Sequence, residues 1–553
     1  MLADLRRGGR AASSSAQALA VVALWRLAAA DPDAAATQIE QHEGTRLAAL
    51  ELARAWGGVA RQAALKQHAK AAEFAKRAFA AWDKAVARGR PSSATTSDID
   101  PTGAAAVPLP PRRPHEAAFS DEVLAWTARA ALRGGNGTPD KARWALVLRA
   151  IEEMSAAEQR DAAWVYWRAR AIRGGAAAGP EGDSARALAR MTLESIAAPL
   201  GFYPQLALED LGRRVQLPAP PVPLVEGERE PLRRHPGLAR AQRLLALGLR
   251  AEGVREWNYS LRGMNDRELL AAAALACERE IWDRCINTSE RTRDVADITQ
   301  RYPLPFREAV LARAAESGVD PSYVYGLIRQ ESRFVLDARS GVGASGLMQL
   351  MPATARWTAR RAGLAEWRPE LVNERDINLL LGTTYLKLVT EEFGGAQAMG
   401  AAAYNAGPAR PRRWREGALV EPAAWVEGIP FNETRDYVKK VLSNAVIYSL
   451  RLRSLGLGGA PGAAASAAAA SAVPSAASAA ASAAPAAEAA SVAASAAASA
   501  AASAAGAPAA GVAPGGGNSA AAALVGPVSL RARLGGPIGP RDPAAPAENR
   551  DLP

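Results

Sequence analysis

Alanine-rich segments with helical periodicity dominate this chain and restrict what it can fold into. From about residue 16 to 217, apolar residues recur three and four positions apart, and Pro and Gly are concentrated between the segments. That spacing is typical of one face of a helix. Alternating β-branched residues, which would predict strands, are scarce. Because 553 residues are also too many for one domain, the sequence predicts an all-α protein of several domains.

Composition divides the chain into four parts. Residues 1–217 are predicted to form an irregular helical superhelix, interrupted by a disordered loop at about 88–117, which is rich in Pro, Ser and Thr. After a proline-rich boundary, a small helical linker domain is predicted at 233–302 and a compact module at 303–453. Residues 454–553 are mostly Ala, Ser, Pro and Gly, a composition that cannot build a core. We predict that they form a disordered tail.

The N-terminus has a pattern similar to a signal peptide. Leu5, Arg6 and Arg7 precede an apolar run at 16–25, but Arg26 interrupts that run. We therefore expect a helix of the first domain, in a chain without a convincing export signal. No apolar run reaches the length of a transmembrane helix.

The formal charge of +11 is compatible with an anionic partner such as nucleic acid, a membrane surface or an acidic cell-wall polymer. No lysine-rich tail and no aromatic-basic RNA-binding pattern accompanies it, so nucleic acid is not expected. An arginine-rich composition from a GC-rich genome explains the charge equally well.

Cysteine and histidine usage limits the chemistry. The two cysteines, Cys277 and Cys285, lack the spacing of a zinc site and either form a disulfide or are two buried thiols; we favour the disulfide. All four histidines lie outside 303–453. A Ser-His-Asp triad, a Cys-His dyad and a histidine metal site are therefore excluded from that module, and we expect no metal and no cofactor. Acid–base chemistry there must use carboxylates.

Glu331 is the most informative carboxylate of the module. Asp320 and Pro321 are a good N-cap and first residue for a helix, and the apolar face of that helix continues, at helical spacing, to Glu331. Burial and the negative end of the helix dipole would both raise the pKa of this side chain. Such a glutamate could donate a proton and take it back. The alternative is a surface glutamate beside Arg329 or Arg333.

The glycine-rich stretch 341–346 matches the letters of a dinucleotide-binding motif, with Glu366 at the position of a ribose-binding acid. That motif must follow a strand and open a helix. Because a predicted helix precedes it here, we interpret the glycines as a tight turn.

Four segments around Glu331 together resemble the soluble lytic murein transglycosylases. They are Gln330-Glu331-Ser332, the stretch 343–355 that begins Gly-Ala-Ser-Gly-Leu-Met-Gln, Ala403-Tyr404-Asn405-Ala406-Gly407-Pro408, and the stretch 429–438 from Ile-Pro-Phe-Asn-Glu to Tyr-Val. The resemblance covers 303–453 closely and the N-terminal helices more loosely. It implies a goose-type-lysozyme-like catalytic fold and cleavage of peptidoglycan. The N-terminal region is shorter than the family's full ring of helices, and the tail is additional.

The resemblance implies that Glu331 protonates the oxygen between N-acetylmuramic acid and N-acetylglucosamine and then, as a base, activates the C6 hydroxyl. Closure onto C1 gives a 1,6-anhydro end without water. Alternatives are a hydrolytic muramidase and a non-catalytic helical scaffold for cell-wall partners.

The remaining roles are also implied by the resemblance. The residues expected to bind substrate are Ser340, Gln349, Met351, Tyr404, Asn405 and Glu433. Tyr404 could orient Glu331 or the acetamido group of the sugar, Met351 could instead be core, and Asn405 could be a helix C-cap. Glu433 either contacts substrate or lies in the first turn of a helix capped by Asn432. Expected partners are peptidoglycan strands and, as candidates, cell-wall synthesis or division proteins; we expect a periplasmic monomer.

Overall fold

The computed structural model describes residues 14–43, 46–89, 118–134, 141–457, 524–542, 549 and 551–553. All named elements in these ranges are helices, and the β-type pairings there are isolated bridges, so the predicted all-α fold is confirmed. None of the described helices is long and apolar enough to cross a bilayer. The predicted loop residues 90–117 and the tail residues 458–523, 543–548 and 550 lie outside the described ranges.

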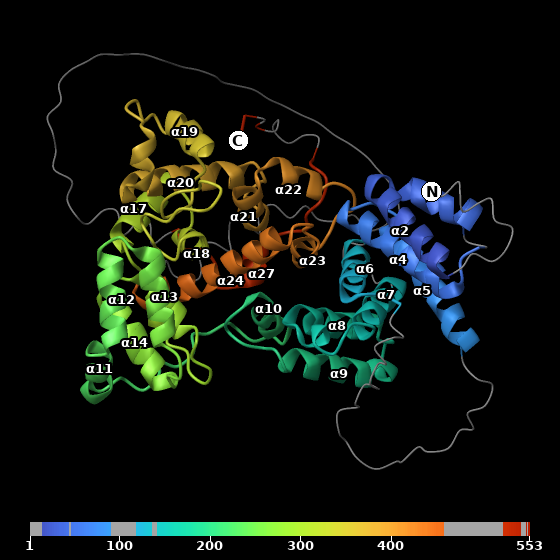
Figure 1. Ribbon diagram of the computed structural model, residues 1–553, viewed down its shortest axis with the longest axis horizontal. Helices are drawn as coiled ribbons and strands as arrows, with labels where there is room; N and C mark the ends of the chain where they lie inside the picture. The colour runs from blue at the N-terminus through green and yellow to red at the C-terminus, as the bar shows by residue number, and fades with distance from the viewer. Residues whose placement is uncertain are drawn as a thin grey trace, which may run out of the picture.

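The helical region, residues 14–217, is a succession of helices that pack on their chain neighbours (Figure 1). Its helices are α2 (Ser14–Ala30), α3 (Pro32–Gln38), α4 (Ala49–Leu65), α5 (Ala71–Gly89), α6 (Asp121–Arg133), α7 (Lys141–Glu152), α8 (Ala162–Gly175), α9 (Asp183–Glu194) and α10 (Phe202–Asp210). Alanine and glycine allow close approach. A Cβ atom on Gly58 of α4 would lie 1.8 Å from Nε1 of Trp25, on α2. The apolar run 16–25 therefore packs as part of a helix of this region, as we expected.

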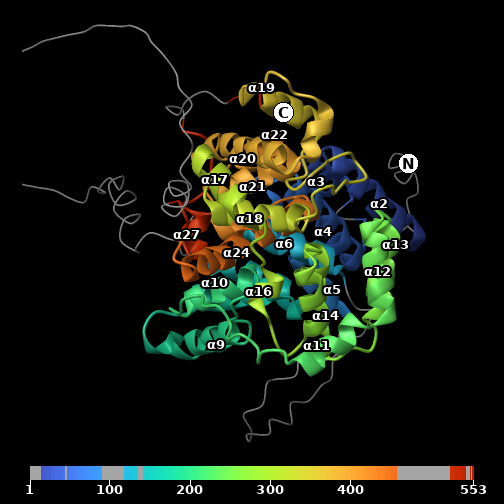
Figure 2. The same ribbon diagram turned by 90° about the vertical axis from the view of Figure 1, so that its left-hand side faces the viewer.

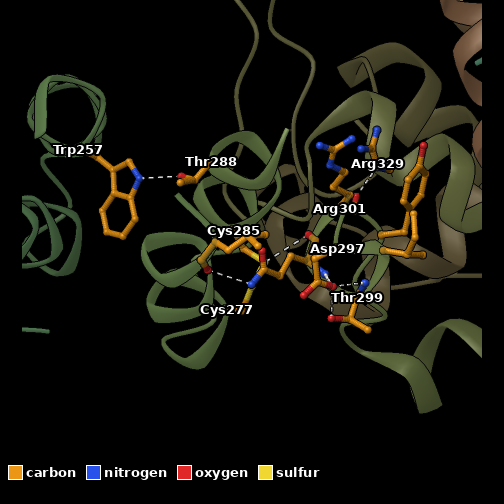
Figure 3. The surroundings of a disulfide bond; sticks show 12 residues. Trp257, Cys277, Cys285, Thr288, Asp297, Thr299, Arg301 and Arg329 are labelled. Carbon is orange, nitrogen blue, oxygen red and sulfur yellow. Dashed lines mark hydrogen bonds between the residues drawn. A yellow bond between two sulfur atoms is a disulfide. The ribbon is translucent and has the colours of Figure 1, made fainter. Parts of the chain in front are cut away.

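The linker region, residues 218–302, has a hydrophobic cluster of its own around the fully buried Trp257 and Leu238. Its helices are α11 (Glu226–Arg233), α12 (Pro236–Ala246), α13 (Arg250–Ser260), α14 (Asp266–Glu278), α15 (Trp282–Ser289) and α16 (Ile298–Arg301). The predicted disulfide is confirmed: Cys277 of α14 is bonded to Cys285 of α15 (Figure 3). It joins two helices that a short turn separates.

The central module, residues 303–457, lies between the other two regions (Figure 1). Its helices are α17 (Arg307–Ser317), α18 (Pro321–Glu331), α19 (Pro352–Arg361), α20 (Arg375–Glu391), α21 (Gln397–Ala406), α22 (Ala409–Trp414), α23 (Pro422–Glu427) and α24 (Asn432–Ser454). Helix α18 packs closely along α24, and every residue from Pro321 to Arg329 is buried. The module shares one continuous core with the helical region.

The C-terminal segment, residues 524–542, departs from the disordered tail that we expected for 454–553. It contains α27 (Leu530–Leu534), and both views place this helix beside α24 (Figures 1 and 2). Leu530, Leu534 and Ile538 are buried, and Ile538 forms a β-bridge with Val420. These three residues recur every four positions, a pattern that the low-complexity composition around them obscured.

Candidate active site

The helix that carries Glu331 begins as the sequence predicts. The Asp320 side chain caps α18 by accepting a hydrogen bond from the Ser322 amide (2.9 Å), and Pro321 is the first helical residue. Leu327 and Ile328 are completely buried on the face that leads to Glu331. Packing of this apolar face against α24 therefore fixes where the last turn, and Glu331 with it, can lie.

Glu331 is held as a protonatable acid. Its side chain is partly open to solvent but closely surrounded by protein, and burial raises its pKa to about 8. The negative charge of Glu433 adds to this increase in pKa. A hydrogen bond that the Tyr437 hydroxyl donates to Oε1 of Glu331 (2.6 Å) opposes it. At neutral pH the carboxyl group is therefore mostly neutral and can act as an acid.

The alternative of a surface glutamate paired with an arginine does not hold. Arg329 and Arg333 both bind Glu290 of the linker region, each at 2.7 Å. These two cations therefore hold the linker region against the central module and do not pair with Glu331.

The glycine-rich stretch is a tight turn between helices α18 and α19. Because a helix precedes it, it does not have the strand-then-helix arrangement of a dinucleotide-binding motif. The Ser340 hydroxyl accepts a hydrogen bond from the Ala344 amide (2.9 Å), which closes the turn. Gly346 has a φ of +83°, and a Cβ atom there would lie 2.1 Å from the Asn378 side chain. Glycine is thus required both by the backbone and by the buried Asn378 that anchors the turn.

Gln349 and Met351 follow this turn and have different surroundings. Gln349 has a φ of +44°, and its side-chain amide donates to the carbonyl groups of Ala338 and Gly346 (both 2.8 Å). Its described contacts therefore brace the turn. Met351 is 41% exposed at the N-cap position of α19, so it is a surface side chain and the core alternative is wrong.

Tyr404 and Asn405 lie in the last turns of α21. The Tyr404 hydroxyl donates to the Met348 carbonyl (2.8 Å), and the pKa of Tyr404 is raised well above its usual value by burial and then by Glu331. It is therefore near the acid but does not orient it directly through a described hydrogen bond. Asn405 accepts from the Thr434 hydroxyl (2.7 Å), and the C-cap is Gly407, so the C-cap alternative for Asn405 is wrong.

Glu433 lies in the first turn of α24 and is exposed. The predicted cap is wrong: Phe431 occupies the N-cap position, and the Asn432 side chain accepts a hydrogen bond from Arg435 (2.5 Å). Glu433 is nevertheless close enough to Glu331 to raise its pKa.

Tyr437 is the site residue that sequence reasoning missed, although it lies in one of the four segments quoted above. It follows Glu433 by one helical turn, so the two residues share a face of α24. This i,i+4 spacing from Glu433 is readable in the sequence and could have identified Tyr437 as a site residue.

In the described ranges, no group of three His, Cys, Asp or Glu side chains is arranged to hold a metal ion.

Three protein families match parts of this chain. Residues 308–420 match the "Transglycosylase SLT domain", residues 231–294 the "Soluble lytic murein transglycosylase L domain" and residues 428–456 the "Soluble lytic transglycosylase helical domain". These three matches lie between residues 231 and 456 and make that part of the chain similar to soluble lytic transglycosylases. The matches to the first and third of these families together cover the acid, the glycine-rich turn and the face of α24 that carries Tyr437.

Curated relatives show the same similarity. The soluble lytic murein transglycosylase of Salmonella typhimurium is 31% identical over 288 residues, which is 52% of this chain and 43% of that protein. The Escherichia coli K12 protein of the same name is 30% identical over the same shares of the two chains. The chain therefore spans less than half the length of these curated relatives.

Solved structures agree at the level of the fold. An inactive mutant of the lytic transglycosylase Slt from Pseudomonas aeruginosa matches with a TM-score of 0.63 and 26% identity, over 82% of this chain and 66% of that one. The 70 kDa soluble lytic transglycosylase of E. coli matches with a TM-score of 0.59 and 24% identity, over 82% and 65%. Both matches extend beyond the central module into the N-terminal helices of this lytic transglycosylase-like chain.

Proposed function

We propose that this protein is a peptidoglycan lytic transglycosylase that cleaves the β-1,4 bond between N-acetylmuramic acid and N-acetylglucosamine. One observation carries the proposal. Glu331, on the central helix of a transglycosylase SLT domain, is a carboxylic acid whose pKa is raised to about 8. The curated relatives are named soluble lytic murein transglycosylases, and we propose the substrate of that name, murein, for this chain as well.

The first step uses Glu331 as the acid. Its proton passes to the glycosidic oxygen, the bond from that oxygen to C1 of the muramic acid breaks, and positive charge develops at C1. The N-acetyl group of the same sugar can stabilise that charge, as in substrate-assisted glycosidases. A neutral acid in a poorly solvated site suits this step because its conjugate base is created only when the proton leaves.

The second step uses the same carboxylate as the base. Glu331 accepts the proton of the C6 hydroxyl, and the C6 oxygen bonds to C1, which gives a 1,6-anhydro end and restores the acid. The attacking group belongs to the sugar itself, so the step benefits from proximity. One carboxyl group therefore serves both steps, and no water molecule is consumed.

The carboxylates near Glu331 support this single-acid scheme. A retaining hydrolase needs a second carboxylate about 5–5.5 Å from the acid to act as a nucleophile. Among the described residues, Glu433 is near enough to raise the pKa of Glu331 and Asp337 is near it in sequence; both side chains are exposed. We assign Glu433 to substrate contact and to tuning Glu331. We also assign Ser340, Met351 and Asn405 to the binding groove, and Gln349 and Tyr404 to its support.

The compartment is part of the proposal. The Cys277–Cys285 disulfide favours an oxidising compartment. The proposed substrate lies in the periplasm, and the formal net charge of +11 suits an anionic polymer there. Interaction with cell-wall synthesis or division proteins and a monomeric state stay predictions.

The experiment that tests the proposal is digestion of purified sacculi by the Glu331→Gln variant. Loss of the acid should lower the rate of muropeptide release about 10²–10⁴-fold. Glu366→Gln, which removes an exposed carboxylate at the position of the rejected ribose-binding acid, is the matched control and should retain full activity. Full activity of Glu331→Gln would refute the assignment, and wild-type protein that binds sacculi without releasing products would favour a scaffold.

A further inference from the structure

The C-terminal segment contacts both large parts of the molecule through neighbouring arginines. Arg531 binds Asp210 of α10 and the Tyr166 hydroxyl of α8 (2.9 Å) in the helical region. Arg533, two positions on, binds Asp320 in the central module (2.7 Å). The short helix α27 therefore bridges two regions that are distant in sequence, as its position beside α10 and α24 in Figure 2 illustrates.

Arg533 is the most buried anchor of the segment. Its side chain has no exposed surface, and its guanidinium donates to the hydroxyl groups of Ser322 (2.6 Å) and Ser449 (2.5 Å) as well as to Asp320. A buried guanidinium is costly unless charge and hydrogen bonds compensate it, and here both are present. Both terminal nitrogens of the guanidinium thus have partners among the described residues, whereas Nε has none there.

The backbone around Gly526 completes the same contact. Its amide donates to Oδ1 of Asp320 (2.9 Å), and its carbonyl accepts from the Ser449 hydroxyl (3.0 Å). A Cβ atom on this residue would lie 2.2 Å from Oδ2 of Asp320. Glycine is therefore needed for the segment to approach the carboxylate so closely.

Asp320 links this contact to the acid. It is the N-cap of α18, whose last residue is Glu331, so the segment binds the opposite end of the catalytic helix. The segment is also held by the helical region: the carboxylate of Glu209, on α10, accepts hydrogen bonds from the amides of Leu530 and Arg531 (2.6 and 3.0 Å).

We propose that residues 524–542 form an intramolecular clamp that docks the central module onto the helical region and holds the start of helix α18, with Arg533 as its anchor. The chain's own C-terminal segment is therefore the partner that occupies the surface formed by Asp320, Ser322, Ser449 and Glu209. Its effect on catalysis rests on the function proposed above, whereas its docking does not.

The test uses the full chain with a protease recognition site inserted between residues 457 and 524. After cleavage, the C-terminal fragment should remain bound through gel filtration, and release of muropeptides from sacculi should be unchanged. In the cleaved Arg533→Ala variant the fragment should dissociate, with affinity weakened about 100-fold or more. Activity should then fall, and the amides of α18 should exchange hydrogen faster.

The controls separate the clamp from a general loss of folding. Ala532→Gln changes an exposed neighbour on α27 and should leave the fragment bound. Gly526→Ala keeps the arginine but blocks the approach to Asp320, so it should release the fragment even if Arg533→Ala fails to fold. Excess peptide 524–542 should displace the fragment from the cleaved wild type and preserve activity.

Two results would overturn the proposal: separation of the wild-type fragment with activity unchanged, or retention of the fragment by the variants of both Gly526 and Arg533. A fragment that stays bound in a protein that releases no muropeptides would refute the proposed function and leave the clamp intact.

Discussion

At the scale of single residues, the account depends on how Glu331 is kept protonated. Burial is the main cause of its raised pKa, the charge of Glu433 contributes in the same direction, and the hydroxyl of Tyr437 opposes both. Because the same group must donate and then accept a proton, a pKa near the working pH is more useful than one at the ordinary value of 4.5. Each of these three influences can be changed separately.

The pH dependence of activity should report this acid. Only the protonated form can donate, so the rate should be maintained through neutral pH and fall as the pH rises past about 8. The measurement is the initial rate of muropeptide release between pH 5 and about 10, a range chosen to span the carboxyl titration. A decline centred near the ordinary carboxyl value would show that the site does not protect the acid.

Replacement of Tyr437 by Phe should act on both rate and pH profile. The carboxylate of Glu331 loses a stabilising hydrogen bond, so the pKa of Glu331 should rise. The fall in rate at alkaline pH should then occur at a higher pH than in the wild type. Loss of orientation should lower the rate roughly tenfold.

Glu433→Gln provides the opposite test, because removal of a nearby negative charge should lower the pKa of Glu331. The fall in rate at alkaline pH should then occur at a lower pH than in the wild type. Shifts of the two variants in the same direction would contradict this electrostatic description.

At the scale of elements, the position of the acid follows from how α18 packs on α24. Gly326 allows the approach: a Cβ atom there would lie 2.7 Å from the Val441 carbonyl and 3.1 Å from the Ala445 amide. Both contacts are with backbone, which cannot rotate away. The acid and Tyr437 lie on these two helices, so their hydrogen bond depends on this separation.

Gly326→Ala should therefore separate the helices. We expect a loss of stability of about 1–3 kcal/mol and reduced activity, since overpacking outweighs the gain in helix propensity. Thermal unfolding and sacculus digestion measure the two effects. Gly227→Ala is the matched control, because a Cβ atom on this glycine of α11 meets nothing within 4 Å and should be neutral or slightly stabilising.

How far the sequence predicts these elements depends on how far apart in the sequence the interacting residues lie. The Asp320 cap and the apolar face of α18 are encoded by short spacings, so local rules predict them. The disulfide is favoured because of the expected oxidising compartment, since the spacing of the two cysteines also allows two buried thiols. The partner of Tyr404, the bracing role of Gln349 and the docking of Arg533 depend on residues brought together only by the fold. Average composition also concealed the regular spacing of apolar residues in the C-terminal segment.

At the scale of the whole molecule, a buried carboxylate joins the helical region to the central module. Glu427 of α23 is 1% exposed and binds Arg129 of α6 (2.9 Å), Lys439 of α24 (2.6 Å) and the Tyr203 hydroxyl of α10. Burial alone would raise its pKa, but Lys439, Arg129 and Arg435 outweigh burial and hold the pKa well below its ordinary value. A second ion pair, between Arg170 of α8 and Glu421 (3.0 Å), joins the same two regions, which therefore share charged contacts as well as a core.

Glu427→Gln should destabilise the folded chain by about 3–5 kcal/mol, because it leaves several cations buried without their partner. The sign of the pH dependence follows from the lowered pKa. The stabilisation is present above the ordinary value of 4.5 and is lost as the pH falls through the lower folded value. Denaturant unfolding at neutral and acidic pH measures this: the difference between wild type and variant should shrink in acid, and a constant difference would contradict it.

The central claim is that one acid cleaves the glycan without water. Mass spectrometry of the products from intact sacculi tests it most directly, because the two outcomes differ by one water molecule. The account predicts muropeptides with 1,6-anhydro-N-acetylmuramic acid ends, formed by wild-type protein and about 10²–10⁴-fold more slowly by Glu331→Gln. Reducing ends from the wild-type protein would contradict it and would identify a hydrolytic muramidase.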